Sequence, residues 1–334
     1  MPRKKKSLIY VLVVLIVIIA ALVLLYQGGR WLEHQTEKPE VRGDYTQRYA
    51  YDNLIEQDGV TYRQRKNLTT ILLMGIDTDD QSAPAQGYRN GGQADFLRLV
   101  VVDHADKSVA QIRIDRDTMT PITVLGVLGN KSGVRTAQIC LSHGFGDGKN
   151  QSCELTVEAI SNLLLGMPID FYVAMNMEGI PALNDMLGGV KVTIADDFSS
   201  LDPSMTPGTT MTLKGDQAEL FVRSRRDIGV GTNEARMARQ EVYVAALADA
   251  LFKRAGKDKE FIGTLYDSLT PYLTTNLPRG RMINEVWSAR NYEKGTVVKP
   301  EGTHTVGSDG FMQFYADESA LKQTVLELFF ERVK

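Results

Sequence analysis

The sequence predicts an α/β domain with a mixed central β-sheet flanked by helices (αβα), preceded by one N-terminal transmembrane helix. Short apolar runs alternate with helix-periodic segments from residue 67 onward, which is typical of layered α/β folds. A continuous uncharged run near the N-terminus stands apart from this pattern. The 334 residues, 43% hydrophobic and 24% charged, are enough for one large domain plus an anchor.

The N-terminus predicts a signal anchor. Basic residues 3–6 precede the uncharged run Leu8–Leu25, which would span about 27 Å as a helix. Basic flanks stay in the cytoplasm, so we expect a cytoplasmic tail over 1–7 and a transmembrane helix over 8–26. The rest would lie outside, in a single-pass protein of the cell membrane. A cleaved signal peptide is the alternative, but no small-x-small cleavage site follows the run.

The remaining chain divides into a stalk and a globular domain. Residues 27–66 are polar and tyrosine-rich, with one short element near 54–62, and we expect the catalytic domain over 67–334. Without the four N-terminal positive charges, the formal net charge falls from −3 to −7. A mildly acidic ectodomain does not favour bulk nucleic-acid binding, and we expect no nucleic-acid partner.

Two cysteines, Cys140 and Cys153, lie beyond the predicted anchor. An even count in an oxidising compartment favours a disulfide, and two independent buried thiols are the alternative. No histidine pair lies near them to complete a metal site. We expect His104 and His143, which fall in predicted loops, at the surface.

Periodicity predicts the individual elements. Continuous or alternating apolar runs indicate strands, and apolar residues three and four apart indicate helices that end at Gly or Pro. The predicted strands are 69–74, 96–102, 108–114, 171–175 and 190–194, and the predicted helices are 154–165, 178–187, 215–223 and 234–254.

Polar residues gather at three places in this pattern. Asp77 follows a buried strand, where open α/β sheets bind ligands, and Asp115–Asp117 follows another. The third group is rich in arginine and occupies residues 223–240. Asp77 could instead cap a turn, Arg116 could form an internal salt bridge with its flanking aspartates, and the arginines could form a solvated face.

The helix over 234–254 favours an anion site for the third group. Its apolar stripe, Tyr243, Leu247 and Leu251, extends backwards to Gln240 and Arg236. An arginine on a buried face must be paired or must face a bound anion. Guanidinium groups near a helix N-terminus suit a diphosphate. With carboxylates holding Mg²⁺ (or Mn²⁺), such a site could stabilise a departing phosphate.

The chain resembles the LytR–CpsA–Psr (LCP) family, bacterial enzymes that attach glycopolymers to the cell wall. The resemblance covers about residues 67–254 and continues more weakly to the C-terminus. It is carried by six segments in order: ILLMGID (71–77), QADFLRLVVVD (93–103), RIDRDT (113–118), GMPIDFYVAMNMEGIPALNDMLGGVKVTI (166–194), LKGDQAELFVRSRRD (213–227) and EARMARQ (234–240).

The resemblance implies transfer of a glycopolymer from a polyprenyl-diphosphate lipid to peptidoglycan, leaving a phosphodiester link; teichoic acid and capsular polysaccharide are both open. It implies an apolar tunnel for the lipid between sheet and helices. Asp95 or Asp115 could accept the acceptor's proton. The implied site residues are Asp77 and Asp95 for the metal, Arg116, Arg223, Arg225, Arg236 and Gln240 for the diphosphate, and Arg116, Asp95 and Asp115 for catalysis.

The sequence departs from the family pattern at two places. Gln93 stands where the family usually has arginine, and Arg89 or Arg98 could replace that contact. Residues 134–136, Val-Arg-Thr, stand where a basic-x-Asn segment is usual, and Arg135 could supply the basic side chain. Two other functions stay open: a polyprenyl-diphosphate hydrolase, and a membrane-anchored binder of lipid-linked glycopolymer without catalysis.

Overall fold

The structure is a computed structural model that describes residues 54–78, 91–126, 129–224, 228–229, 231 and 233–333. The predicted cytoplasmic tail and signal anchor lie outside the described residues, as do Arg89 and residues 225–227. Within the described ranges, no helix combines the length and the apolar character needed to cross a membrane.

A six-stranded mixed sheet forms the centre of the domain, in the order β11-β8-β3-β4-β5-β12. The β3–β8 and β5–β12 pairs are parallel, and the β3–β4, β4–β5 and β8–β11 pairs are antiparallel. The predicted mixed sheet is therefore confirmed. Its strands are β3 (Leu68–Ile76), β4 (Ala94–Asp103), β5 (Ser108–Ile114), β8 (Phe171–Asn176), β11 (Leu273–Thr275) and β12 (Glu293–Val298).

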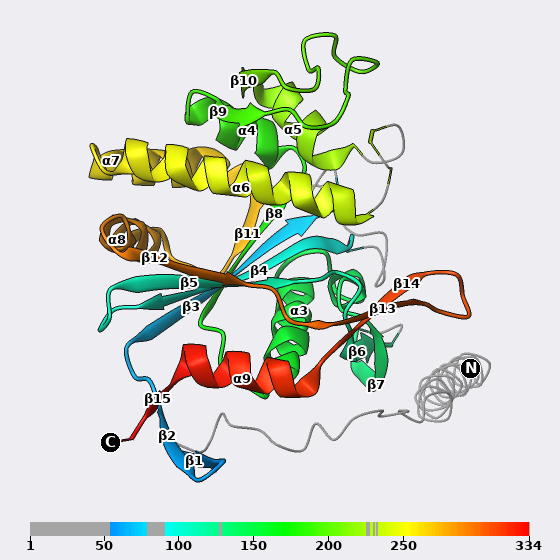
Figure 1. Ribbon diagram of the computed structural model, residues 1–334, viewed down its shortest axis with the longest axis vertical. Helices are drawn as coiled ribbons and strands as arrows, with labels where there is room; N and C mark the ends of the chain where they lie inside the picture. Colours follow the sequence, from blue (N-terminus) through cyan, green and yellow to red (C-terminus); the bar gives the residue numbers. More distant parts are fainter. Residues whose placement is uncertain are drawn as a thin grey trace, which may run out of the picture.

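Helices cover both faces of this sheet (Figure 1). The helices α3 and α9 lie on one face, and α6, α7 and α8 lie on the other, with α4 and α5 beyond α6. The α helices are α2 (Leu141–Gly144), α3 (Asn150–Leu163), α4 (Gly179–Met186), α5 (Gly215–Arg223), α6 (Asn233–Ala255), α7 (Lys259–Leu269), α8 (Arg279–Ala289) and α9 (Glu318–Phe329), and a short 3₁₀ turn η1 (Thr270–Tyr272) follows α7.

The largest core lies between the sheet and the α3/α9 layer. Alternate residues of β4, among them Leu97 and Leu99, point into it and meet Ile160 of α3 and Val325 of α9. Because side chains alternate across a strand, the intervening residues of β4 point to the α6 face. That face includes Phe96 and Val100, which are only half-buried. The sheet thus has one tightly packed face and one less covered face.

Four smaller sheets complete the domain. The strands β1 and β2, within the predicted stalk, pair with the C-terminal strand β15. The β6–β7 hairpin follows the segment with Arg116, and the β13–β14 hairpin lies beside it. The strands are β1 (Leu54–Gln57), β2 (Val60–Gln64), β6 (Met119–Leu125), β7 (Lys131–Gln138), β9 (Val190–Thr193), β10 (Thr210–Leu213), β13 (Gly302–Val306), β14 (Met312–Ala316) and β15 (Phe330–Arg332).

The predicted Cys140–Cys153 disulfide is wrong, because both thiols are free and buried. Cys140 follows β7, and its sulfur lies 3.5 Å from a guanidinium nitrogen of Arg116. Cys153 lies on α3, where its sulfur is 3.9 Å from Nε2 of His143. His143 is itself 1% exposed, so the expectation of a surface histidine is also wrong. The two sulfurs therefore occupy separate sites within the core.

Candidate active site

Two aspartates meet at the ends of the neighbouring strands β3 and β4. Ile76 pairs with Ala94, so Asp77 and Asp95 follow adjacent positions of the sheet. The backbone amides of both aspartates donate to the carbonyl of Gln93, at 2.9 and 3.1 Å. Gly92 makes this turn possible: its φ is +72°, and a Cβ there would lie 2.4 Å from Thr78.

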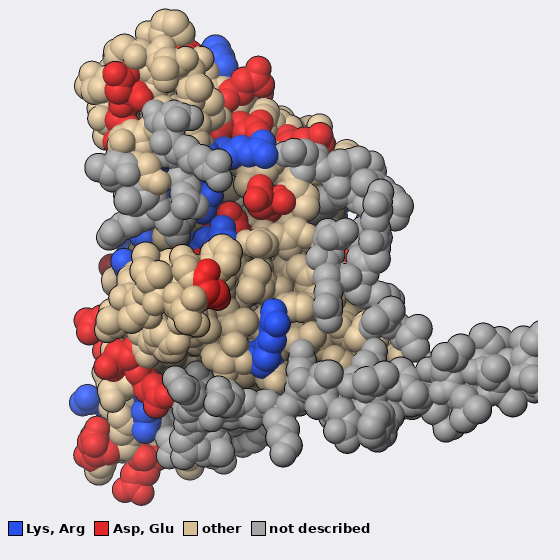
Figure 2. Space-filling model, turned by 90° about the vertical axis from the view of Figure 1, so that its right-hand side faces the viewer, with Lys and Arg blue, Asp and Glu red and all other residues tan. Residues whose placement is uncertain are grey.

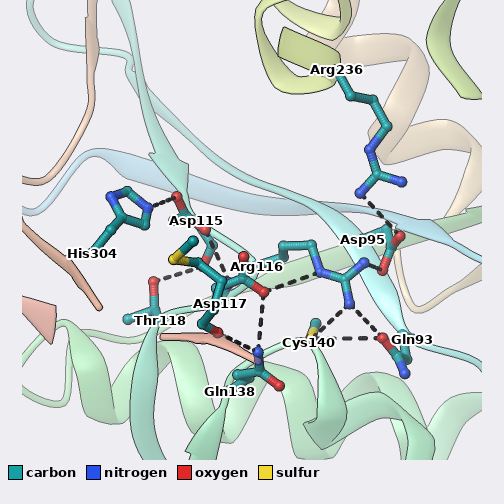
Figure 3. A network of polar contacts seen from close by, with 11 residues as sticks. Gln93, Asp95, Asp115, Arg116, Asp117, Thr118, Gln138, Cys140, Arg236 and His304 are labelled. Carbon is teal, nitrogen blue, oxygen red and sulfur yellow. Dashed lines mark hydrogen bonds and ion pairs between the residues drawn. The ribbon is translucent and has the colours of Figure 1, made fainter. Parts of the chain in front are cut away.

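Arg116 extends from the end of β5 toward Asp95 (Figure 3). Its Nη1 forms an ion pair with Asp95, and its Nη2 donates to Oε1 of Gln93 at 2.5 Å. Its Nε lies 3.5 Å from Asp117. The guanidinium is therefore fixed in position by three side chains. Its side chain is 18% exposed, which leaves it accessible from one side.

Arg236 reaches the same carboxylate from the first turns of α6. Its Nη2 lies 3.4 Å from Oδ2 of Asp95, and its side chain is 12% exposed. The prediction that this arginine lies on the inner face of the helix is therefore confirmed, and of the two predicted alternatives, a paired side chain or one that faces a bound anion, the structure shows an ion pair. Asp95 thus lies between two guanidinium groups from different elements (Figure 3). On the face drawn in Figure 2, basic and acidic side chains lie side by side at mid-height.

Burial governs the protonation of the acidic groups. Burial raises the pKa of Asp95, although Arg116 and Arg236 act to lower it, and the nearby charge of Asp77 raises it further. Burial also raises the pKa of Asp117, again against the effect of Arg116. The guanidinium groups therefore favour the charged form of Asp95 and Asp117, against the effect of burial. An anion that binds these arginines would change the protonation of the two carboxyl groups.

The donor set of Asp77 and Asp95 fits a hard divalent cation that takes few protein ligands. Asp77 is exposed, and among the described residues no hydrogen bond or ion pair engages its carboxylate. The two carboxylates are close enough for the charge of one to raise the pKa of the other. No group of three or more His, Cys, Asp or Glu in the described ranges could hold a metal. A cation here would therefore need phosphate oxygens or water as further ligands, as Mg²⁺ commonly does.

The other predicted diphosphate ligands lie around the end of α5. Arg223, in its last turn, donates to Glu219 at 2.9 Å and is 44% exposed. Gln240 of α6 donates to the carbonyl of Val222 at 3.3 Å, and Arg225 lies outside the described residues. The structure thus brings Asp77, Asp95, Arg116 and Arg236 together. Gln240 contacts α5, the helix whose last residue is Arg223.

Arg239 is not part of a solvated basic face. It is 5% exposed, and it donates to Asp196 at 2.8 Å and to carbonyls of Phe221 and Ser224. These carbonyls belong to the end of α5, where a helix lacks its own donors. Arg239 is therefore a structural residue that ties α6 to α5.

Asp115 points away from Arg116 and Asp95. Its Oδ2 lies 3.0 Å from Nε2 of His304, on β13 (Figure 3). His304 was not among the predicted site residues, because it stands 189 positions further along the chain in a short exposed hairpin. No periodic signal in the sequence links the two segments.

The departures from the family pattern are accommodated differently from what we expected. Gln93 itself contacts Arg116, so this position still serves the cluster. Arg98 points to the α6 face, where it pairs with Glu241 and Gln111. Arg135 lies over the ring of Phe145, with its guanidinium carbon 4.8 Å from the ring centroid. Neither of these arginines joins Arg116.

Comparison with known proteins places the chain in a family. The sequence model of the LytR_cpsA_psr family matches residues 36–328. The chain belongs to this family. The Bacillus subtilis (strain 168) protein polyisoprenyl-teichoic acid–peptidoglycan teichoic acid transferase TagU is 26% identical over 282 residues, which cover 84% of this chain and 83% of that protein. The protein of the same name from Halalkalibacterium halodurans is 25% identical over 238 residues, which cover 71% and 69% of the two chains.

Solved structures share the fold. The crystal structure of B. subtilis TagV superimposes with a TM-score of 0.61 at 23% identity, covering 79% of this chain and 97% of that one. TagT bound to LI-WTA gives a TM-score of 0.60 at 21% identity, covering 79% and 90%. The central mixed sheet with its flanking helices is thus the fold of the LytR_cpsA_psr family.

Proposed function

We propose that this protein is a phosphotransferase that moves a glycopolymer from a polyprenyl-diphosphate lipid onto peptidoglycan. The observation that carries the proposal is the cluster in which Arg116 and Arg236 converge on Asp95 beside the free carboxylate of Asp77. The family and the names of the curated relatives, which are teichoic acid transferases, support it. A teichoic acid is therefore the glycopolymer that we expect.

The reaction needs electrostatic stabilisation more than covalent chemistry. A hydroxyl oxygen of the acceptor attacks the sugar-linked phosphorus while its proton passes to Asp95 or, through water, to solvent, and the bond from this phosphorus to the bridging oxygen breaks. The electron pair leaves with the lipid phosphate, so negative charge grows where Arg116 and Arg236 can neutralise it. Asp77 and Asp95 would hold Mg²⁺ or Mn²⁺, which would neutralise further phosphate charge.

The less covered face of the sheet supports a lipid substrate. Several strand residues beneath α6 are apolar and only half-buried, and they lie on the same face as the buried Arg98. An alkyl chain bound there would remove about 25 cal/mol of unfavourable free energy per Å² of apolar surface covered. The residues concerned are Leu73, Phe96, Val100, Val173 and Met175.

The test is a reconstituted reaction with the full-length chain in detergent. A lipid-diphosphate-linked glycopolymer, un-crosslinked peptidoglycan and Mg²⁺ should yield lipid monophosphate and polymer-bearing peptidoglycan in equal amounts. Lipid monophosphate without polymer-bearing peptidoglycan would indicate the hydrolase instead. Binding of the donor without either product would indicate a non-catalytic binder.

The reaction requires access to a membrane-borne donor, so we also propose that residues 8–26 anchor the protein with its domain outside the cytoplasm. Protease added to cells with permeable walls should then remove the domain and leave a short N-terminal fragment in the membrane. A domain fully protected from protease in intact cells, but cleaved after lysis, would contradict this topology.

A further inference from the structure

The β13–β14 hairpin is joined to the segment that carries Arg116. The backbone amide of Phe314, in β14, donates to the carbonyl of Asp117 at 2.8 Å, and Gln138 donates to the carbonyl of Met312 at 2.6 Å. Asp117 directly follows Arg116 in the chain. From this attachment the hairpin projects beyond the body of the domain (Figure 1). Its outer end, residues 306–312, is called the hairpin tip.

The hairpin tip is a closed turn with its own hydrogen bonds. The backbone amide of Gly307 donates to the carbonyl of Phe311 at 2.8 Å, and that of Gly310 donates to the carbonyl of Gly307 at 2.9 Å. The amide of Phe311 donates to Oδ1 of Asp309 at 3.1 Å. These three amides need no hydrogen bond from water, so they cost little when the tip enters an environment that contains no water.

The side chains of the tip are apolar and exposed. Val306 is 67% exposed, Phe311 64% and Met312 42%. Val306 lies directly opposite Met312 in the hairpin, so these two side chains share one face, and Phe311 is next to Met312 in the chain. In the part of the chain that the structure describes, nine large hydrophobic side chains are exposed, and four of them belong to this hairpin. Such a concentration of apolar surface marks a site of contact.

Charge and position favour a lipid surface as the partner. Asp309 is the one Asp, Glu, Lys or Arg residue between Gly302 and Ala316, so a charged partner gains little from this hairpin. The proposed donor is a membrane lipid, and the hairpin is joined to the segment with Arg116. Residues 27–53, between the proposed anchor and Leu54, could span at most about 90 Å, so the chain length allows the tip to reach the same bilayer.

We propose that the hairpin tip inserts into the extracytoplasmic leaflet of the membrane, with Val306, Phe311 and Met312 in contact with lipid acyl chains. Insertion removes their apolar surface from water and holds the Arg116 segment near the membrane surface, where the lipid diphosphate lies. This inference rests on the proposed function, since it explains how the domain reaches a donor that stays in the bilayer.

Lipid contact at the tip can be measured with a fluorescent label. The full-length Phe311→Cys protein is labelled with the environment-sensitive dye NBD and reconstituted into phosphatidylcholine vesicles; both native cysteines are buried, so the label goes to position 311. Nitroxide-labelled phosphatidylcholine should quench this dye. Leu201→Cys is the matched control, because Leu201 is 48% exposed but lies in the loop between β9 and β10, far from the hairpin (Figure 1). The dye at position 201 should not be quenched.

Turnover gives a second measurement. Phe311→Ser should lower release of lipid monophosphate about tenfold when the donor is in vesicles, as expected from the loss of one buried aromatic side chain. With a short-chain, water-soluble donor it should equal the wild type, because Phe311 does not contact the arginine cluster. Leu201→Ser should equal the wild type with both donors.

Four results would overturn the proposal. The first is no quenching at position 311, and the second is equal quenching at positions 311 and 201, which would mean that the domain lies on the bilayer without a preferred side. The third is a blue-shifted dye at position 311 that lipid nitroxides do not quench, since another protein surface or a second copy would then cover the tip. The fourth is quenching that requires phosphatidylglycerol, because basic residues elsewhere would then hold the domain. Quenching at position 311 alone, in a protein that releases no lipid phosphate, would support the insertion and refute the proposed reaction.

Discussion

Replacing Arg236 with alanine tests whether the cluster stabilises the departing phosphate. Its guanidinium lies 3.4 Å from Asp95 and its side chain is 12% exposed, so it is well placed to act in a partly desolvated site. Removing one such donor typically slows a reaction by about 10²–10³, or roughly 2.7–4 kcal/mol of transition-state stabilisation. Because the charge grows during the reaction, turnover should fall more than donor affinity.

The fold should survive this change. Asp95 keeps its ion pair with Arg116, so the cost should stay below the roughly 3–5 kcal/mol of leaving a buried charge unpaired. The assay is release of lipid monophosphate by the full-length chain, with thermal unfolding measured on the same samples. Arg254→Ala is the matched control, since Arg254 is exposed in the last turn of the same helix. A folded Arg236→Ala protein with wild-type turnover would refute the role of this arginine.

Three further outcomes follow from the described contacts. Asp77→Asn should leave thermal stability nearly unchanged and reduce turnover about 10²-fold or more, and excess Mg²⁺ should restore part of the loss; unchanged turnover would remove Asp77 from the site. Burial lowers the pKa of His143, so below pH 6.5 the unfolded chain binds a proton at this residue more readily than the folded chain. The free energy of unfolding should therefore decrease below pH 6.5, by at most about 1.4 kcal/mol per pH unit. His143→Gln should flatten that slope in urea titrations, and an unchanged slope would place the titration elsewhere. Ellman titration in guanidinium without reductant should find both Cys140 and Cys153, whereas the folded Cys140 thiol should react slowly, because burial raises its pKa to about 12.

The sequence predicted the elements with a clear apolar period. The strand predicted over 108–114 is β5 (Ser108–Ile114), and the helix predicted over 215–223 is α5 (Gly215–Arg223). Helix α6 (Asn233–Ala255) differs from its prediction by one residue at each end. Each of these segments buries one of its faces, so its apolar residues recur with the period of the helix or strand and can be recognised in the local sequence.

Elements without such a pattern escaped prediction. All five residues of β13 are exposed, so this strand lacks the alternation of apolar and polar residues that would reveal it in the sequence. The contact between its His304 and Asp115 could therefore not be predicted. The disulfide was predicted wrongly because the number and spacing of the two cysteines do not show in which direction each side chain points. The chain between them turns through α2, which separates the sulfur beside Arg116 from the one beside His143.

The pairing of β2 with β15 has a consequence for the order in which the domain is completed. Arg63 and Glu331 form an ion pair across this junction at 2.7 Å, although they are 268 residues apart. Synthesis proceeds from the N-terminus, so β2 (Val60–Gln64) is made long before its partner β15 (Phe330–Arg332). Until then β2 presents an unpaired strand edge, which is a site for wrong association. Nascent chains that stall before Phe330 would therefore carry β2 with one open edge.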